Sequence, residues 1–123
     1  MFVTVMMMTG CTKIKTNKLQ GFWSVTPEYS SYWGGYACSD NVYEFTNSNT
    51  VFQYVNVSDG CYSYKPGYND TPVPNHSGWY YGSKKTWTYV FEDDKVILSD
   101  GTIFTYMDGK LYKDGSSIVL SSW

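Results

Sequence analysis

Residues 95–120 contain the runs Lys95-Val96-Ile97-Leu98, Asp100-Gly101, Thr102-Ile103-Phe104-Thr105-Tyr106, Asp108-Gly109, Lys110-Leu111-Tyr112, Asp114-Gly115 and Ser117-Ile118-Val119-Leu120. Short apolar runs therefore alternate with three Asp-Gly pairs. Asp and Gly tolerate the positive φ angles of tight hairpin turns, so this pattern predicts a β-meander. The three aspartates are interpreted first as turn residues.

The two-residue alternation that is typical of strands continues toward the N-terminus. Residues 21–25 are expected to form a first strand, and residues 42–46 and 51–55 flank the turn-forming Asn47-Ser48-Asn49, which predicts a hairpin centred near residue 49. Residues 86–91 alternate between aromatic and polar side chains, as in a half-buried strand. No segment of helical length carries an apolar stripe. We predict an all-β fold, a small antiparallel up-and-down barrel or meander of about seven or eight strands. The expected inward side chains are Trp23, Phe45, Trp87, Tyr89, Phe91, Leu98, Phe104 and Tyr106.

Composition and charge exclude several function classes. The net charge is −2 and all nine basic residues are Lys, which gives no basis for binding nucleic acid. His76, the single histidine, has no Cys or clustered carboxylate nearby, so we expect a solvated loop residue and no zinc site. Glu92-Asp93-Asp94 is interpreted as an exposed turn, and neither Glu28 nor Glu44 has an identifiable partner. We therefore expect no enzyme activity, metal or cofactor.

The N-terminal residues contain a pattern that is typical of membrane-anchored proteins. An apolar leader of eight residues ends in Thr9-Gly10-Cys11, which resembles the cleavage box of a bacterial lipoprotein. The resemblance implies a signal peptide over residues 1–10, lipidation of Cys11, a tether over residues 11–18 and one domain over residues 19–123. Thr at position 12, where Asp would retain the protein at the inner membrane, favours the outer membrane by the same resemblance. A buried N-terminal strand ending in a core cysteine is the alternative.

The other two cysteines, Cys38 and Cys61, lie roughly equidistant from the predicted hairpin turn. An oxidising envelope compartment favours their pairing, and a cross-strand disulfide closing about 23 residues would contribute about 3 kcal/mol. Two buried free thiols are the alternative. The disulfide depends on the lipoprotein assignment, because only then is the cysteine count even.

Residues 59–83 form a long connection that contains three of the four prolines. A loop of this length in a compact domain is usually functional or disordered. Its flanks, residues 61–64 and 78–81, are expected to pair as short strands. Aromatic side chains in this loop and in an earlier Tyr- and Gly-rich connection are candidates for ligand binding: Trp33, Tyr36, Tyr64, Tyr68, Trp79 and Tyr80. The alternative is that half of them belong to the core or to a second cluster beneath the loop.

The leader, the first-strand sequence Leu19-Gln20-Gly21-Phe22-Trp23-Ser24-Val25 and the closing meander together resemble small bacterial lipocalin-like lipoproteins of the kind abundant in Bacteroidetes. The resemblance implies that Gly21-x-Trp23 begins the first strand, with Trp23 packed across the closed end of a barrel. It also implies a non-enzymatic, lipid-anchored envelope protein that binds a small apolar or glycan-like ligand.

The chain is shorter than full-size lipocalins, and it lacks a visible C-terminal helix and the basic residue that often covers the Trp. These departures leave open whether the barrel encloses a cavity or is filled with side chains. A second hypothesis is a protein-binding module, such as an inhibitor of a hydrolase, that inserts the loop of residues 59–83 into its partner. A filled barrel with a protruding loop would favour this second hypothesis.

Overall fold

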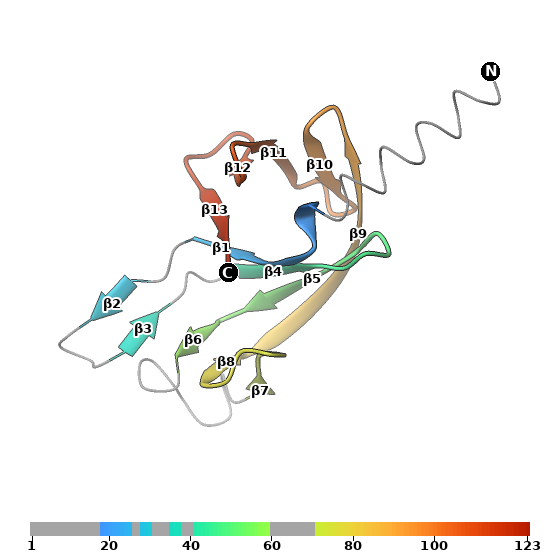
Figure 1. Cartoon of the computed structure of the whole chain (residues 1–123). Coiled ribbons are helices and arrows are strands. Elements are labelled where there is room, and N and C mark those ends of the chain that lie inside the picture. The colour runs from blue at the N-terminus through green and yellow to red at the C-terminus, as the bar shows by residue number, and fades with distance from the viewer. Residues whose placement is uncertain (1–17, 26–27, 31–34, 38–40, 60–70) are drawn as a thin grey trace, which may run out of the picture.

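The protein is all-β, and its main body is a closed antiparallel barrel of eight strands. The computed structural model describes residues 18–25, 28–30, 35–37, 41–59 and 71–123. Within these ranges there are thirteen strands, eight in the barrel and five shorter ones in a second sheet (Figure 1). The predicted all-β barrel of seven or eight strands is confirmed, whereas the second sheet was not predicted.

The barrel strands follow one another around the wall in chain order. They are β1 (Gly21–Ser24), β4 (Asn41–Phe45), β5 (Thr50–Val55), β9 (Ser83–Glu92), β10 (Lys95–Leu98), β11 (Ile103–Met107), β12 (Lys110–Lys113) and β13 (Val119–Ser122). Each pairs antiparallel with the next, and β13 pairs with β1 to close the barrel. This up-and-down arrangement leaves none of the eight strands as a free edge.

Positive φ angles mark the tight turns of the meander. Asp108 and Gly109 have φ angles of 53° and 74° between β11 and β12, and Asp93 and Asp94 have φ angles of 51° and 63° between β9 and β10. Positive φ at both central residues is the requirement of a two-residue hairpin turn of type I′. The turn predicted for residues 92–94 is confirmed, and all three side chains are exposed.

Side chains fill most of the barrel interior. Along β9, Tyr89 and Phe91 are buried while Thr88 and Val90 are exposed, as the alternation predicted. The interior cluster consists of Leu19, Trp23, Tyr43, Phe45, Val51, Tyr89, Phe91, Val96, Leu98, Phe104, Leu111 and Leu120. Trp87 and Tyr106, also predicted to point inward, are half-buried and pack against this cluster. All eight predicted inward residues therefore contribute to the interior.

Trp23 and Leu19 occupy the end of the barrel at which β1 begins. The indole Nε1 of Trp23 donates a hydrogen bond of 2.7 Å to the carbonyl oxygen of Leu19. The Trp23 ring also meets Tyr106 edge to face, with centroids 6.4 Å apart. Tyr106 lies at the same end, because β11 runs antiparallel to β10 and finishes where β1 starts. This end is closed by packed side chains.

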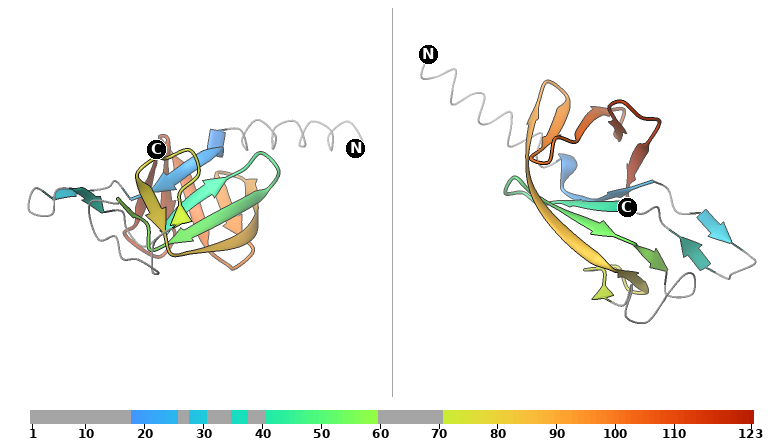
Figure 2. Two further views of the ribbon diagram at one scale, coloured as in Figure 1. Left: turned by 90° about the horizontal axis from the view of Figure 1, so that it is seen from below. Right: turned by 180° about the vertical axis from the view of Figure 1, so that it is seen from behind.

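The second sheet arises at the opposite end, where β1 and β5 finish. Its strands are β2 (Glu28–Ser30), β3 (Gly35–Ala37), β6 (Ser58–Asp59), β7 (Thr71–Pro72) and β8 (Trp79–Tyr81), in the order β2-β3-β6-β8-β7. They come from the β1–β4 and β5–β9 connections. Figures 1 and 2 show that β2 and β3 project away from the barrel. The pairing of Ser58 with Tyr80 continues the register of the β5–β9 ladder, in which Val55 pairs with Ser83.

The structure differs from the sequence expectations at two points in the loops, and a third expectation falls on residues outside the described ranges. Residues 79–81 pair with residues 58–59 and 71–72, so the loop is not the simple hairpin tip that was predicted; the proposed partner strand, residues 61–64, lies outside the described residues. The β4–β5 hairpin is centred at residue 48, halfway between the paired Phe45 and Val51, one residue before the predicted centre. Cys38 and Cys61 lie outside the described residues, and their disulfide remains a prediction.

Candidate functional site

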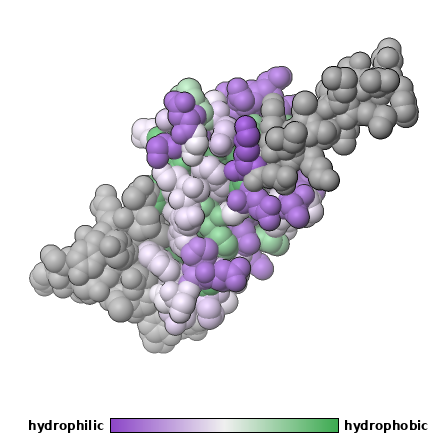
Figure 3. All heavy atoms as spheres, in the orientation of Figure 1, coloured by the Kyte–Doolittle hydropathy of each residue, from purple (hydrophilic) through white to green (hydrophobic). Residues whose placement is uncertain are grey.

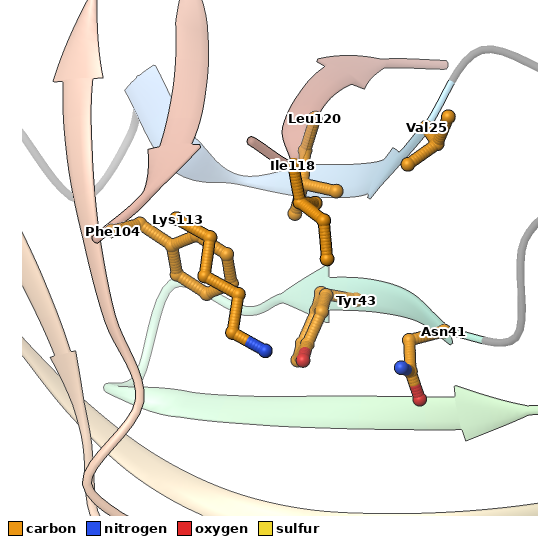
Figure 4. Close-up of a pocket in the computed structure, with 7 residues that line it drawn as sticks. All are labelled: Val25, Asn41, Tyr43, Phe104, Lys113, Ile118 and Leu120. Carbon is orange, nitrogen blue, oxygen red and sulfur yellow. The ribbon is translucent and has the colours of Figure 1, made fainter. Parts of the chain in front are cut away.

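A pocket of about 190 Å³ lies at the end of the barrel where β1 finishes, opposite Trp23. Its lining residues come from five strands or their immediate continuations: Val25, Asn41, Tyr43, Phe104, Lys113, Ile118 and Leu120 (Figure 4). Topology explains why they meet. β4, β11 and β13 begin at this end, whereas β1 and β12 finish there. The pocket is therefore the open mouth of a barrel that is filled below it.

Two aromatic rings form the deep part of the pocket. Tyr43 is 5% exposed and Phe104 is fully buried, and their rings meet edge to face with centroids 5.4 Å apart. Burial raises the pKa of the Tyr43 phenol to about 12, and the negative charge of Asp100 adds to the shift. At neutral pH the deep part of the pocket is therefore apolar apart from one uncharged hydroxyl.

Polar side chains lie at the rim. Lys113, the last residue of β12, is half-buried and points into the pocket (Figure 4). Asn41, at the start of β4, accepts a 2.8 Å hydrogen bond from Gln53 Nε2, and Gln53 Oε1 in turn accepts a 2.8 Å bond from Trp87 Nε1. This chain of hydrogen bonds joins β4, β5 and β9 beside the pocket and fixes the position of the Asn41 side chain.

A second hydrophobic cluster lies outside the barrel, on the outer face of β1, β4 and β5. Its buried members are Phe22, Val42, Tyr54, Val57 and Val73, with Phe52, Trp79 and Tyr81 packed against them. The Tyr54 hydroxyl donates a 2.6 Å hydrogen bond to Glu44, so the expectation that Glu44 lacks a partner is wrong. Burial, together with this bond to a carboxylate, raises the pKa of Tyr54.

His76 is not the freely solvated loop residue that the sequence suggested. It is half-buried, with its ring centroid 4.4 Å from that of Phe22 and 4.6 Å from that of Trp123. The backbone explains this position: the His76 amide donates to Val73 and the Trp79 amide donates to His76, so the loop turns tightly back over the barrel wall. Trp123 is held by a 2.6 Å hydrogen bond from its Nε1 to Ser24. His76 thus joins the loop to the outer wall.

The predicted ligand-binding aromatics have different positions. Trp79 and Tyr80 are half-buried, and the Trp79 ring lies 5.4 Å from that of Trp123 within the second cluster. For Trp79 the structure therefore favours the alternative of a cluster beneath the loop. Tyr36 pairs with Tyr29 through its backbone in β3, and its side chain lies outside what the structure describes. Trp33, Tyr64, Tyr68 and the lipidation candidate Cys11 also lie outside the described residues.

The pocket-lining residues were not among the predicted site residues, although one signal for them was present in the sequence. In Lys110-Leu111-Tyr112-Lys113, an inward Leu111 requires an inward Lys113, because side chains of a strand alternate between the two faces. A charged residue at an inward position near a strand end indicates a solvent-accessible barrel mouth. No sequence signal predicted the hydrogen bonds among Asn41, Gln53 and Trp87, because these residues are far apart in the sequence.

Neither a metal-binding cluster nor a membrane-spanning helix is found among the described residues. The described residues contain no group of three or more His, Cys, Asp or Glu side chains placed to hold a metal ion. In the same ranges there is no helix of the length and hydropathy needed to cross a bilayer. On the face seen in Figure 3, hydrophobic residues occupy a limited area between hydrophilic ones.

No protein-family model matches this chain, and neither a curated protein nor a solved structure shows significant similarity to it.

Proposed function

We propose that this protein is a non-enzymatic, lipid-anchored envelope lipoprotein whose open barrel end binds a small, mainly apolar ligand. The observation that carries the proposal is the pocket at the barrel mouth, which five apolar or aromatic side chains and two polar ones line. Small-molecule sites in proteins have this composition, with few polar groups that orient the ligand. The envelope location and the lipid anchor rest on the resemblance of Thr9-Gly10-Cys11 to a lipoprotein cleavage box.

The pocket favours an apolar ligand over a glycan. A sugar ring presents hydroxyl groups on most of its edge, and each hydroxyl buried without a partner costs free energy. Asn41 and Lys113 at the rim and the Tyr43 hydroxyl are the polar groups that the lining residues supply. The volume of about 190 Å³ is below the range of typical ligand sites, about 300 to 1,000 Å³. The expected ligand is therefore a single ring or a short chain.

A second candidate is a protein-binding module, for example a hydrolase inhibitor that uses residues 59–83. Two observations favour it: side chains fill most of the barrel, and the second sheet projects beyond the barrel at the same end (Figure 2). In this case the partner would contact β2, β3 and the connection before β8, and the pocket would not be required.

The substitution Ile118→Trp is expected to abolish binding of small apolar ligands. Ile118 is 40% exposed at the rim, so the larger side chain has room to fit without disturbing the core, yet its ring would occupy the mouth of the pocket. Binding is measured by titrating the full chain with benzyl alcohol and with benzoate and following the methyl resonances of Val25, Ile118 and Leu120. Wild-type protein should show saturable shifts with at least one probe.

Val90→Trp is the matched control, because Val90 is 53% exposed on the outer face of β9, away from the pocket. It should bind the probes as wild type does. If neither probe shifts the pocket methyls, or if Ile118→Trp binds as well as Val90→Trp, the ligand-binding proposal is wrong. A protein partner that is captured equally well by Ile118→Trp would support the second candidate instead.

The Cys11→Ser substitution is expected to release the protein from membranes. The thiol of Cys11 is the predicted lipid acceptor, and a serine hydroxyl does not replace it in this modification. Fractionation of cells that express either form, together with the intact mass of the purified protein, checks the expectation. A variant that partitions with membranes like wild type, or a wild-type mass without lipid, contradicts the anchor.

A further inference from the structure

Lys113 is a charged side chain among the mainly apolar residues that line the pocket. On the basis of the proposed function, we propose that the ligand is a small carboxylate, a single ring or short chain with one anionic group, and that Lys113 binds this group. The apolar part of the ligand would lie against Tyr43 and Phe104, below the rim.

The ammonium group of Lys113 has no counter-ion in the part of the chain that the structure describes. The ion pair formed there is between Lys95 and Asp114, with the nitrogen and oxygen 2.8 Å apart, and Lys113 takes no part in it. Lys113 is nevertheless half-buried and lines the pocket. An anion bound in the pocket could form a charge-assisted hydrogen bond with this ammonium group.

The carboxylates near Lys113 in the sequence and in the next turn form hydrogen bonds with other groups. Asp114 follows Lys113 directly, but one of its oxygens accepts from Lys95 and the other accepts a 2.7 Å bond from the Thr105 hydroxyl. These bonds lower the pKa of Asp114, so it stays ionised as the partner of Lys95. Asp100 accepts a 3.0 Å hydrogen bond from the Thr102 amide in the β10–β11 turn. Neither aspartate lies within ion-pair distance of the Lys113 ammonium.

Lys113 sets the number of charges on the ligand. Among the described residues that line the pocket it is the charged one, so a single anionic group on the ligand matches the charge that the pocket supplies. The expected ligand is therefore a monoanion.

The size of the pocket sets the apolar part of the ligand. An apolar cavity of about 150 Å³ accommodates benzene in another protein, so about 190 Å³ has room for one aromatic ring with a short substituent. The edge-to-face pair of Tyr43 and Phe104 offers aromatic contact to such a ring. Benzoate and phenylacetate satisfy both the size and the charge, and benzyl alcohol is the matched neutral probe.

The test compares these probes on the full chain and on charge variants. Wild-type protein should bind benzoate and phenylacetate at least about tenfold more tightly than benzyl alcohol, in line with the strength of a charge-assisted hydrogen bond. Lys113→Met keeps an apolar stem without the charge and should remove this preference, measured as the ratio of the benzoate and benzyl alcohol affinities of the same variant. Lys113→Arg keeps the charge and should retain it. Lys110→Met is the matched control, because Lys110 is exposed and its ammonium donates to Ser121.

Different results separate this inference from the proposed function. If wild type binds benzyl alcohol as tightly as benzoate, or if Lys113→Met binds benzoate as wild type does, the pocket binds ligands but does not select a carboxylate through Lys113. If none of the probes shifts the methyl resonances of Val25, Ile118 and Leu120, both the inference and the proposed ligand-binding function are wrong. A loss of benzoate binding in Lys110→Met equal to that in Lys113→Met indicates general charge attraction and also overturns the inference.

Discussion

The substitution Trp23→Ala is expected to lower the free energy of unfolding by about 3 to 5 kcal/mol. Trp23 is 3% exposed and closes the end of the barrel opposite the pocket. Its removal leaves a cavity next to Tyr106 and deprives the Leu19 carbonyl of the 2.7 Å hydrogen bond from the indole. Since domains of this size are stable by only about 5 to 15 kcal/mol, the loss is a large share of the total. Urea unfolding followed by circular dichroism measures it.

Trp23→Phe serves as the control for the hydrogen bond. It keeps an aromatic ring at the closed end but cannot donate to Leu19, so it should lower the free energy of unfolding less than the alanine variant does. A loss below about 1 kcal/mol for Trp23→Ala would contradict the closed end of the barrel, because such small effects are typical of surface substitutions. Benzoate binding by the folded fraction of Trp23→Ala should persist, since Trp23 is not among the residues that line the pocket.

Tyr54→Ala is expected to lower the free energy of unfolding by a comparable amount, about 3 kcal/mol or more, although Tyr54 does not point into the barrel. Its side chain is 1% exposed in the second cluster, with its ring 4.8 Å from that of Tyr81 and 6.0 Å from that of Phe22. It therefore holds the segment around β8 against the outer wall. The variant should also speed hydrogen exchange of the amides of residues 73–82, which pack on this cluster.

Tyr54→Phe separates packing from the hydrogen bond to Glu44. It keeps the ring contacts and loses the 2.6 Å hydrogen bond, so the free energy of unfolding is expected to fall by about 1 to 2 kcal/mol. If Tyr54→Ala changes neither the stability nor the exchange of residues 73–82, the second cluster does not fasten this segment to the barrel. Measurements at neutral pH suffice, because burial raises the pKa of Tyr54 and its hydroxyl remains protonated there.

Most of the barrel could be predicted from the sequence because its signals are local. The Asp-Gly pairs fix turns within four residues, and the alternation of Trp87, Tyr89 and Phe91 with polar residues follows from the period of a strand. Local hairpins build β4–β5 and the run from β9 to β13, which together make up most of the wall. The inward residues were predicted for the same reason.

The second sheet and the second cluster could not be predicted in this way. They bring together two connections that are separated by β4 and β5, and among the described residues the pairing of Ala37 with Ser58 joins them. His76 shows the consequence: its neighbours in sequence are polar or small, but its neighbours in space are Phe22 and Trp123, 54 and 47 positions away. The alternation of inward and outward side chains along a strand carries no information about such contacts.

The sequence by itself determined an all-β chain, its tight turns and the inward face of each barrel strand, because these depend on backbone preferences and on burial over a few residues. Only the tertiary structure decided that the barrel closes by pairing β13 with β1, that side chains fill it below one open mouth, and that Lys113 at this mouth lies beside Tyr43 and Phe104 in one pocket. The physical reason is closure. The ends of separate strands meet around a common opening only when every strand has found its register, and a pocket is the space that packing leaves unfilled.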